Sequence, residues 1–278
     1  MSANLQRGYN ALKEVLDAPI ASYFSSCVHC GLCAEACMFY TESGNPKYTP
    51  IHKLEPLRRV WFQEATLAGK LMRLVGLAKP VTDELLAEWS PLVYDSCSLC
   101  GRCSMVCPVG NDIAYMVRKL REGMAASGNA PEGLVGASKR TVAIGSPMGV
   151  KWPAVQAQIR HVQKDTGLTV PVDQAGVEYL VLMSSMEIMN YPEYLAALTR
   201  IFHKAGASWT LASDAFEATN SGIQIGASDI AREIVMRIVN AAERLQVGTV
   251  VSPECGHAFT AIRWEGPNLA GRTFGFKV

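Results

Sequence analysis

In the first half of the chain, apolar residues recur every three or four positions, which is the spacing of one face of a helix. One such stretch runs from Leu54 to Leu67. A second follows Thr82, where a hydroxyl before acidic residues is typical of a helix N-terminus. A third is predicted to be capped by Asn111 and to end near Gly128. The pattern therefore predicts an all-helical domain over residues 1–128.

The pattern changes after residues 129–150, where glycine and proline replace periodicity and predict a linker. Beyond it, short apolar runs alternate with helical stretches. The runs are Tyr179–Met183, Trp209–Leu211 and Thr249–Ser252, and the helical stretches are Tyr191–Ala205 and one that starts at Asp229. This alternation predicts an α/β domain with a mostly parallel sheet over residues 151–278, with Pro267–Val278 as a terminal extended segment.

Composition excludes several classes of function. The 278 residues are enough for two domains, and 26 basic against 25 acidic residues give a net charge of +1. With so small a net charge, the protein has no strongly positive field that could attract a phosphate backbone, so nucleic acid is not an expected partner. The start of the chain has neither a signal peptide's apolar centre nor a transit peptide's arginine bias, and no apolar stretch has the length of a membrane span. We therefore expect a cytoplasmic protein whose membrane association, if any, comes through a partner.

Eight of the nine cysteines form two copies of the pattern Cys-x-x-Cys-x-x-Cys-x-x-x-Cys. The copies are Cys27, Cys30, Cys33 and Cys37, and Cys97, Cys100, Cys103 and Cys107. In two-cluster ferredoxins the first three thiolates of such a run hold one [4Fe–4S] cluster, and the fourth ligates the other cluster. The spacing thus predicts two [4Fe–4S] clusters, the first on Cys27, Cys30, Cys33 and Cys107, and the second on Cys97, Cys100, Cys103 and Cys37.

Two other uses of the cysteines fit less well. Zinc sites usually present separated Cys-x-x-Cys pairs that complete one tetrahedron. A disulfide framework is typical of small secreted domains, and this chain is long and shows no secretory signal. Met38 stands after the first run where Pro108 stands after the second, but proline is not a ligand, so the predicted ligation is unaffected.

The two runs with a helical insert between them resemble the helical ferredoxin of heterodisulfide reductase C-type subunits and of succinate dehydrogenase iron–sulfur subunits. Three further segments are similar to the D-type heterodisulfide reductase subunits and to the related K subunit of the membrane complex that serves dissimilatory sulfite reductase. They are Tyr94–Cys103, Ser252–Phe259 and Arg263–Asn268. The resemblance implies a helical ferredoxin domain followed by an α/β domain of the Cys-Cys-Gly type.

In those relatives, Cys-Cys-Gly sequences bind a noncubane cluster at the site of disulfide chemistry. Here Ser184 and Ser185 stand where a ligand cysteine is expected, and Asn220-Ser221-Gly222 stands where Cys-Cys-Gly is expected. Cys255 remains, with Ala258 at its partner position. Serine and asparagine are poor ligands for iron compared with thiolates. The resemblance therefore implies a degenerate, cysteine-depleted module.

The longer relatives continue into a second such module, and this chain ends at Val278. We therefore expect a partner that resembles a B-type heterodisulfide reductase subunit with an intact Cys-Cys-Gly domain. A flavin-containing A-type subunit or a membrane quinone-linked subunit is a further expected partner. The resemblance implies a non-catalytic electron-transfer subunit in sulfur metabolism that relays electrons to a partner carrying thiol, disulfide or sulfur chemistry.

Three other groups have both a functional and an ordinary interpretation. Cys255 and His257 could form a reactive pair that acts on a thiol or persulfide substrate, which would make the chain a reductase itself. The alternative, which we favour, is a packed thiol with a histidine that caps a turn. His29 either tunes the reduction potential of a nearby cluster or is an exposed residue without a specific role. A basic patch on the helical insert either docks an acidic electron partner or is a solvated helix face, which we favour; it comprises His52, Lys53, Arg58 and Arg59.

Overall fold

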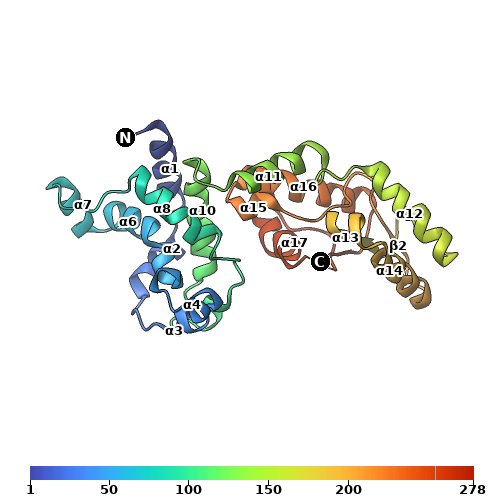
Figure 1. Cartoon of the computed structure of the whole chain (residues 1–278), viewed down its shortest axis with the longest axis horizontal. Helices are drawn as coiled ribbons and strands as arrows, with labels where there is room; N and C mark the ends of the chain where they lie inside the picture. The colour runs from blue at the N-terminus through green and yellow to red at the C-terminus, as the bar shows by residue number, and fades with distance from the viewer. Residues whose placement is uncertain (254) are drawn as a thin grey trace. The chain divides into compact units, whose positions relative to one another are not determined.

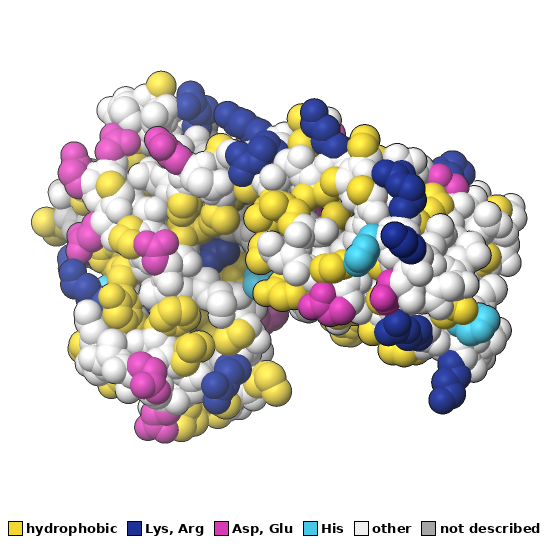
Figure 2. Space-filling view, turned by 45° about the vertical axis from the view of Figure 1, so that its right-hand side comes forward, with side chains coloured by type: hydrophobic (Ala, Val, Ile, Leu, Met, Phe, Trp, Pro, Cys, Tyr) yellow, Lys and Arg dark blue, Asp and Glu magenta, His cyan; other side chains and the backbone are white. Residues whose placement is uncertain are grey.

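The computed structural model describes residues 1–253 and 255–278, and it divides the chain into two compact units. The first unit is Met1–Glu132 together with Ile225–Ala227. The second is Gly133–Gln224 together with Ser228–Val278. Basic and acidic side chains are interspersed on the face seen in Figure 2, in keeping with the small net charge.

The first unit is built from helices, coloured blue to green in Figure 1. They are α1 (Ala3–Glu14), α2 (Ala18–Ser26), α3 (Leu32–Glu35), α4 (Met38–Ser43), the 3₁₀ turn η1 (Pro46–Tyr48), α5 (Pro50–Lys53), α6 (Glu55–Ala65), α7 (Leu67–Leu74), α8 (Asp83–Tyr94), α9 (Arg102–Met105) and α10 (Ile113–Ala126). The insert between the cysteine runs is helical, as its periodicity predicts.

Side-chain caps determine where several of these helices begin. The Thr82 hydroxyl accepts a hydrogen bond from the N–H of Leu85 and caps α8, as predicted. The prediction for α10 was off by one residue, because Asp112 caps this helix by accepting from the N–H of Tyr115. Asn111 is buried and bonds to a different helix, so its side chain is not available for capping.

Helices α1 and α10 approach each other closely at two glycines. A Cβ atom on Gly8 would lie 2.6 Å from the Cβ of Ser127, and one on Gly123 would lie 2.3 Å from the Cγ of Leu12. Leu12 is fully buried at this crossing. The absence of two side chains thus allows α1 to pack directly on α10, the helix that follows the second cysteine run.

The second unit contains a parallel sheet of three strands in the order β2-β1-β3. The strands are β1 (Tyr179–Val181), β2 (Trp209–Thr210) and β3 (Thr249–Val251), and they lie where the apolar runs predict strands. The helices are α11 (Glu132–Ile144), α12 (Trp152–Thr166), α13 (Ser185–Asn190), α14 (Pro192–Ala205), α15 (Ser221–Ile225), α16 (Ser228–Arg244), α17 (Gly256–Thr260), the π-helical turn η2 (Ala261–Glu265) and α18 (Gly266–Ala270).

Alternate residues from Leu180 to Met183, in β1 and directly after it, pack into two separate cores. Leu180 and Leu182 belong to a core formed with α16 and η2, whereas Val181 and Met183 belong to a core formed with α12 and α14. Because successive side chains of a strand point to opposite faces, the sheet is covered by helices on both sides. All four of these residues are buried, which explains the unbroken apolar run in the sequence.

Two segments differ from the sequence-based expectation. Helix α11 occupies most of residues 129–150, the segment predicted to be a linker, and it buries Ser138 and Thr141. The segment predicted to be extended begins instead with α18, and only Lys277 pairs with the sheet, through a parallel bridge to Thr249. In both segments the local glycine and proline signals are outweighed by packing.

Candidate iron–sulfur site

Each cysteine run folds into a loop with the same backbone conformation. The residue before the second cysteine has a positive φ in both runs, 54° at His29 and 56° at Leu99. The residue after that cysteine is also left-handed, with φ of 85° at Gly31 and 78° at Gly101. This region is costly for residues with a side chain and readily adopted by glycine. The two left-handed residues curl each loop tightly before a short helix, α3 or α9, begins.

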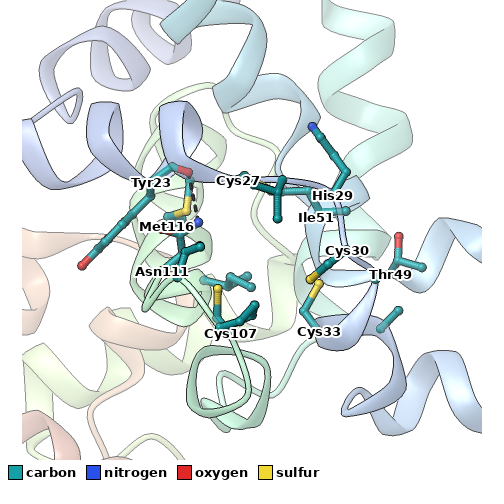
Figure 3. Close-up of a pocket in the computed structure, with 16 residues that line it drawn as sticks. Tyr23, Cys27, His29, Cys30, Cys33, Thr49, Ile51, Cys107, Asn111 and Met116 are labelled. Atoms are coloured by element: carbon teal, nitrogen blue, oxygen red, sulfur yellow. Dashed lines mark hydrogen bonds between the residues drawn. The ribbon is translucent and has the colours of Figure 1, made fainter.

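The first pocket brings together cysteines from both runs. Cys27, Cys30 and Cys33 line it with Cys107, and it encloses about 130 Å³. Figure 3 shows Cys30 and Cys33 next to each other, with Cys107 across the pocket from them. The remaining lining is largely apolar and includes Val28, Ile51, Val109, Ile113 and Met116.

The second pocket contains the complementary set. Cys97, Cys100 and Cys103 line it with Cys37, and it encloses about 40 Å³. Its apolar lining includes Phe39, Ile113 and Val117, and Lys53 contributes a charged side chain. In each pocket, therefore, the first three cysteines of one run lie with the fourth cysteine of the other run.

The donor sets of both pockets fit iron–sulfur ligation. A [4Fe–4S] cluster is held by four cysteine thiolates, and each pocket presents four. Across the residues that the structure describes, no group of three His, Cys, Asp or Glu side chains is arranged to hold a single metal ion. The cysteines instead surround spaces with largely apolar walls.

Burial raises the pKa of two of these thiols, Cys33 and Cys103. Burial, together with the neighbouring Cys97 and Cys100, raises the pKa of Cys103 to about 12. Burial likewise raises the pKa of Cys33, with a further contribution from nearby cysteines. Iron is ligated by thiolates, so cluster binding at these positions must release protons.

Helix α10 and the residue before its cap connect the two runs. Ile113, at the start of α10, lines both pockets. The Asn111 amide donates to the carbonyl of Tyr23 (3.1 Å) and accepts from the hydroxyl of Ser26 (2.8 Å). These bonds join the end of α2, directly before Cys27, to the segment after Cys107. Asn111 is therefore a positioning residue for two cysteines of the first pocket.

The structure corrects the interpretation of the basic patch. Arg58 and Arg59 form ion pairs with Glu55, at 2.7 and 2.8 Å, as helix-surface residues do. Lys53 is neither solvated nor available for docking, because only 2% of it is exposed and it lies in the wall of the second pocket. Its place in the sequence, on a periodic helical insert, gave no sign of this. His29 is exposed at the rim of the first pocket.

A second buried cation was also missed. The Arg121 guanidinium on α10 donates to the carbonyl of Cys97 (2.7 Å) and to the carbonyl of Val93 (2.8 Å). Only 4% of this residue is exposed. The sequence offered no comparable signal for this arginine. It did offer one for the shared conformation of the two cysteine loops, because a glycine, Gly31 or Gly101, follows the second cysteine of each run.

In the second unit, Ser184 and Ser185 take part in the unit's own hydrogen bonds. The Ser184 hydroxyl accepts from the N–H of Glu187, whose carboxylate accepts from the N–H of Ser184, forming a capping box for α13. The Ser185 hydroxyl bonds to Ser146 (2.7 Å) and to the carboxylate of Glu217. Both serines are buried, so these bonds satisfy polar groups that water does not reach.

The Asn220-Ser221-Gly222 segment is similarly built into the unit. The Asn220 amide donates to the carbonyl of Ala231 (3.0 Å), and the Ser221 hydroxyl pairs with that of Thr141 (3.2 Å). A Cβ on Gly222 would lie 2.3 Å from the backbone nitrogen of Ala231, so only glycine fits against α16 here.

Cys255 has a local structural role. Its sulfur accepts a hydrogen bond from the N–H of Ala258 (3.4 Å) at the start of α17, and its side chain packs against the core that contains Leu180. His257 is half-buried in the same short helix. Glu254, which belongs to the motif at this position, lies outside the described residues.

Comparison with known proteins agrees with the ligand chemistry. Residues 23–111 match the 4Fe–4S dicluster domain family. The chain is 30% identical over 261 residues to the Hdr-like menaquinol oxidoreductase iron–sulfur subunit 2 of Archaeoglobus fulgidus, covering 89% of this chain and 47% of the relative. It is 27% identical over 262 residues to the corresponding iron–sulfur subunit of Archaeoglobus profundus, with the same coverage of 89% and 47%.

A third relative is the D subunit of the dihydromethanophenazine:CoB–CoM heterodisulfide reductase of Methanosarcina barkeri. The identity is 24% over 258 residues, covering 91% of this chain and 60% of the relative. The chain thus spans about half the length of the Archaeoglobus relatives and 60% of the Methanosarcina protein. No solved structure matches the chain.

These findings define an iron–sulfur protein with a 4Fe–4S dicluster domain. Within that class, the chain is similar to heterodisulfide-reductase-like iron–sulfur subunits, which confirms the resemblance seen in the sequence. Among the described residues, no helix has both the length and the apolar character needed to cross a membrane.

Proposed function

We propose that the chain relays single electrons through two [4Fe–4S] clusters as a subunit of a heterodisulfide-reductase-like complex. The observation that carries this proposal is the meeting of cysteines from both runs in each pocket. In the proposed ligation, Cys27, Cys30, Cys33 and Cys107 hold the first cluster, and Cys97, Cys100, Cys103 and Cys37 hold the second. When bound, such clusters exchange one electron each.

The protein's own residues shape the relay. Ile113 contributes to the walls of both pockets, so a single helix end separates the two sites. The linings of both pockets are largely apolar, and the surroundings of a cluster are among the factors that set its potential. Asn111 fixes the loop that carries Cys107 against the end of α2.

The second unit is proposed to be a degenerate Cys-Cys-Gly module that contacts partners and carries no cluster. Buried hydrogen bonds of Ser184, Ser185 and Asn220 support this role. The proposed partners are a B-type-like subunit with an intact Cys-Cys-Gly domain and a flavin-containing or quinone-linked subunit. Cys255 as a catalytic thiol is not favoured, because its sulfur caps α17 and packs against the core.

Iron and sulfide analysis with EPR, on anaerobically purified protein, tests the proposal. We expect about eight irons per chain and an interacting two-cluster signal that appears only on reduction. Markedly less iron, or a signal in the oxidised state, would contradict it.

The crossed ligation has its own test. Cys37→Ser is expected to damage the cluster on the second run, and Cys107→Ser the cluster on the first. Cys255→Ser is the matched control and is expected to leave both signals unchanged. Loss of the first cluster in Cys37→Ser would show that each run holds its own cluster.

A further inference from the structure

Lys53 is a buried cation beside a cysteine of the second pocket. Its ammonium lies 3.9 Å from the sulfur of Cys37, donates to the carbonyl oxygen of Ser96, and sits 5.2 Å from the centre of the Phe39 ring. Only 2% of the residue is exposed. Among the described residues, no carboxylate forms an ion pair with it. A buried ammonium is costly unless an opposite charge compensates it, and Cys37, as a thiolate ligand, would supply that charge.

The two pockets differ in charge. Lys53 and the exposed Arg102 line the second pocket, and Arg121 donates to the carbonyl of Cys97 in the same run. The described residues that line the first pocket include no lysine or arginine. Neither set of described lining residues contains an aspartate or glutamate. The difference in fixed charge between the two sites is therefore set by cations at the second.

A fixed positive charge favours the more negative, reduced state of a nearby redox centre. The effect is larger for a buried charge, because water and salt screen it less. Net charge, hydrogen bonds to the sulfurs and solvent exposure all act on the potential of an iron–sulfur cluster. Lys53 combines a charge, burial and proximity to the Cys37 sulfur, whereas Arg102 is exposed to solvent.

We propose that Lys53 raises the reduction potential of the cluster at the second pocket above that of the cluster at the first. This inference rests on the proposed function, since it requires both clusters. It gives the relay an order: an electron supplied to the first site by a one-electron donor passes to the second. The first cluster is thereby oxidised by one electron and the second reduced by one, and no bond is made or broken.

Two substitutions separate the charge of Lys53 from its structural contact. Lys53→Met keeps a long unbranched side chain without charge, and Lys53→Gln keeps a donor for the Ser96 carbonyl without charge. Lys47→Met is the matched control, because Lys47 is an exposed lysine that pairs with Glu88 at 3.2 Å. It removes the same charge six positions earlier in the insert, from a site that solvent screens.

The measurement is an EPR-monitored redox titration of the anaerobically purified full chain, with iron content determined on the same samples. The signals are assigned with Cys30→Ser, which perturbs the first cluster, and Cys100→Ser, which perturbs the second. In the unsubstituted protein we expect the second cluster to be reduced first. Both Lys53 variants should lower its midpoint potential by at least about 59 mV, a tenfold change for a one-electron couple. The first cluster, and both clusters of Lys47→Met, should keep their potentials.

The inference is overturned if the second cluster is reduced at or below the potential of the first in the unsubstituted protein. It is also overturned if the iron-loaded Lys53 variants leave that potential unmoved, or if Lys47→Met produces the same shift. If both Lys53 variants lose iron, the inference is judged by the order of the two midpoint potentials in the unsubstituted protein, and it stands only if the second cluster is reduced first. An iron content well below about eight per chain in the unsubstituted protein would instead reject the two-cluster function itself.

Discussion

Replacing Gly123 by alanine is expected to destabilise the first unit, although alanine ordinarily stabilises a helix. The added Cβ would lie 2.3 Å from the Cγ and 2.4 Å from the Cδ2 of Leu12 on α1. Leu12 is fully buried and cannot move into solvent. The substitution therefore forces α1 and α10 apart, and α10 carries residues that line both cysteine pockets.

The expected change in the free energy of unfolding is the sum of two opposing contributions. Overpacking a well-packed contact costs about 1–3 kcal/mol. Alanine in place of glycine within a helix returns about 1 kcal/mol. The net destabilisation is then roughly 1 kcal/mol, and no more than about 2. For a unit of this size, 1 kcal/mol lowers the unfolding midpoint by about 4 °C.

Thermal unfolding followed by far-UV circular dichroism measures the effect. The iron-loaded protein should be compared anaerobically at one scan rate, because metal-containing proteins need not unfold in two states. Gly136→Ala in α11 is the matched control: its Cβ would meet only the Arg140 side chain at 3.4 Å, an ordinary contact. We expect that control to raise the midpoint or leave it unchanged.

The Leu12→Ala background provides the decisive comparison. Leu12→Ala alone is expected to cost about 2–5 kcal/mol, but it removes the atoms that Gly123→Ala would contact. The second substitution should therefore cost less in that background than in the unsubstituted chain. An equal penalty in both backgrounds, or a midpoint raised by Gly123→Ala as by Gly136→Ala, would refute the close crossing of α1 and α10.

Two further substitutions test the framework around the site. Leu180→Ala removes a fully buried side chain from the central strand and is expected to destabilise the second unit by about 2–5 kcal/mol, as measured by chemical denaturation. The EPR signals of the clusters should stay unchanged. Altered signals would show that the cluster sites depend on the folding of the second unit. Thr82→Ala removes the α8 cap and is expected to cost about 1 kcal/mol in the first unit by the same measurement, whereas Thr82→Ser should retain most of the stability. Equal losses in the alanine and serine variants would exclude the hydroxyl as the source of the effect.

The sequence predicted those features that local periodicity or spacing encodes. The strand around Leu180 appears as an apolar run because both faces of the sheet are covered there, so neither face requires polar residues. The cysteine spacing predicted two sets of four thiols because such a run is suited to wrapping a cluster. In each case, a residue's neighbours in the chain carry the relevant information.

What the sequence could not predict depends on contacts between distant segments. Lys53 resembles any surface lysine of an amphipathic helix, and its burial depends on Ser96, 43 positions away. Asn111 and Asp112 are both good caps, and only the position of Tyr23 decides that Asn111 bonds to α2. Helix α11 contains Gly133 and Gly136, and each glycine costs about 1 kcal/mol in a helix. The helix forms all the same, and it buries Ser138 and Thr141.

The matching left-handed residues of the two cysteine loops give the first unit an approximate internal symmetry. His29 and Gly31 in one loop have the same conformations as Leu99 and Gly101 in the other. Two equivalent sites would have no preferred direction for an electron. Residues 38–96 lie between the runs and place Lys53 at one site alone, so this insert breaks the symmetry. Directionality in such a unit can therefore be changed by altering the insert, without touching a single cysteine.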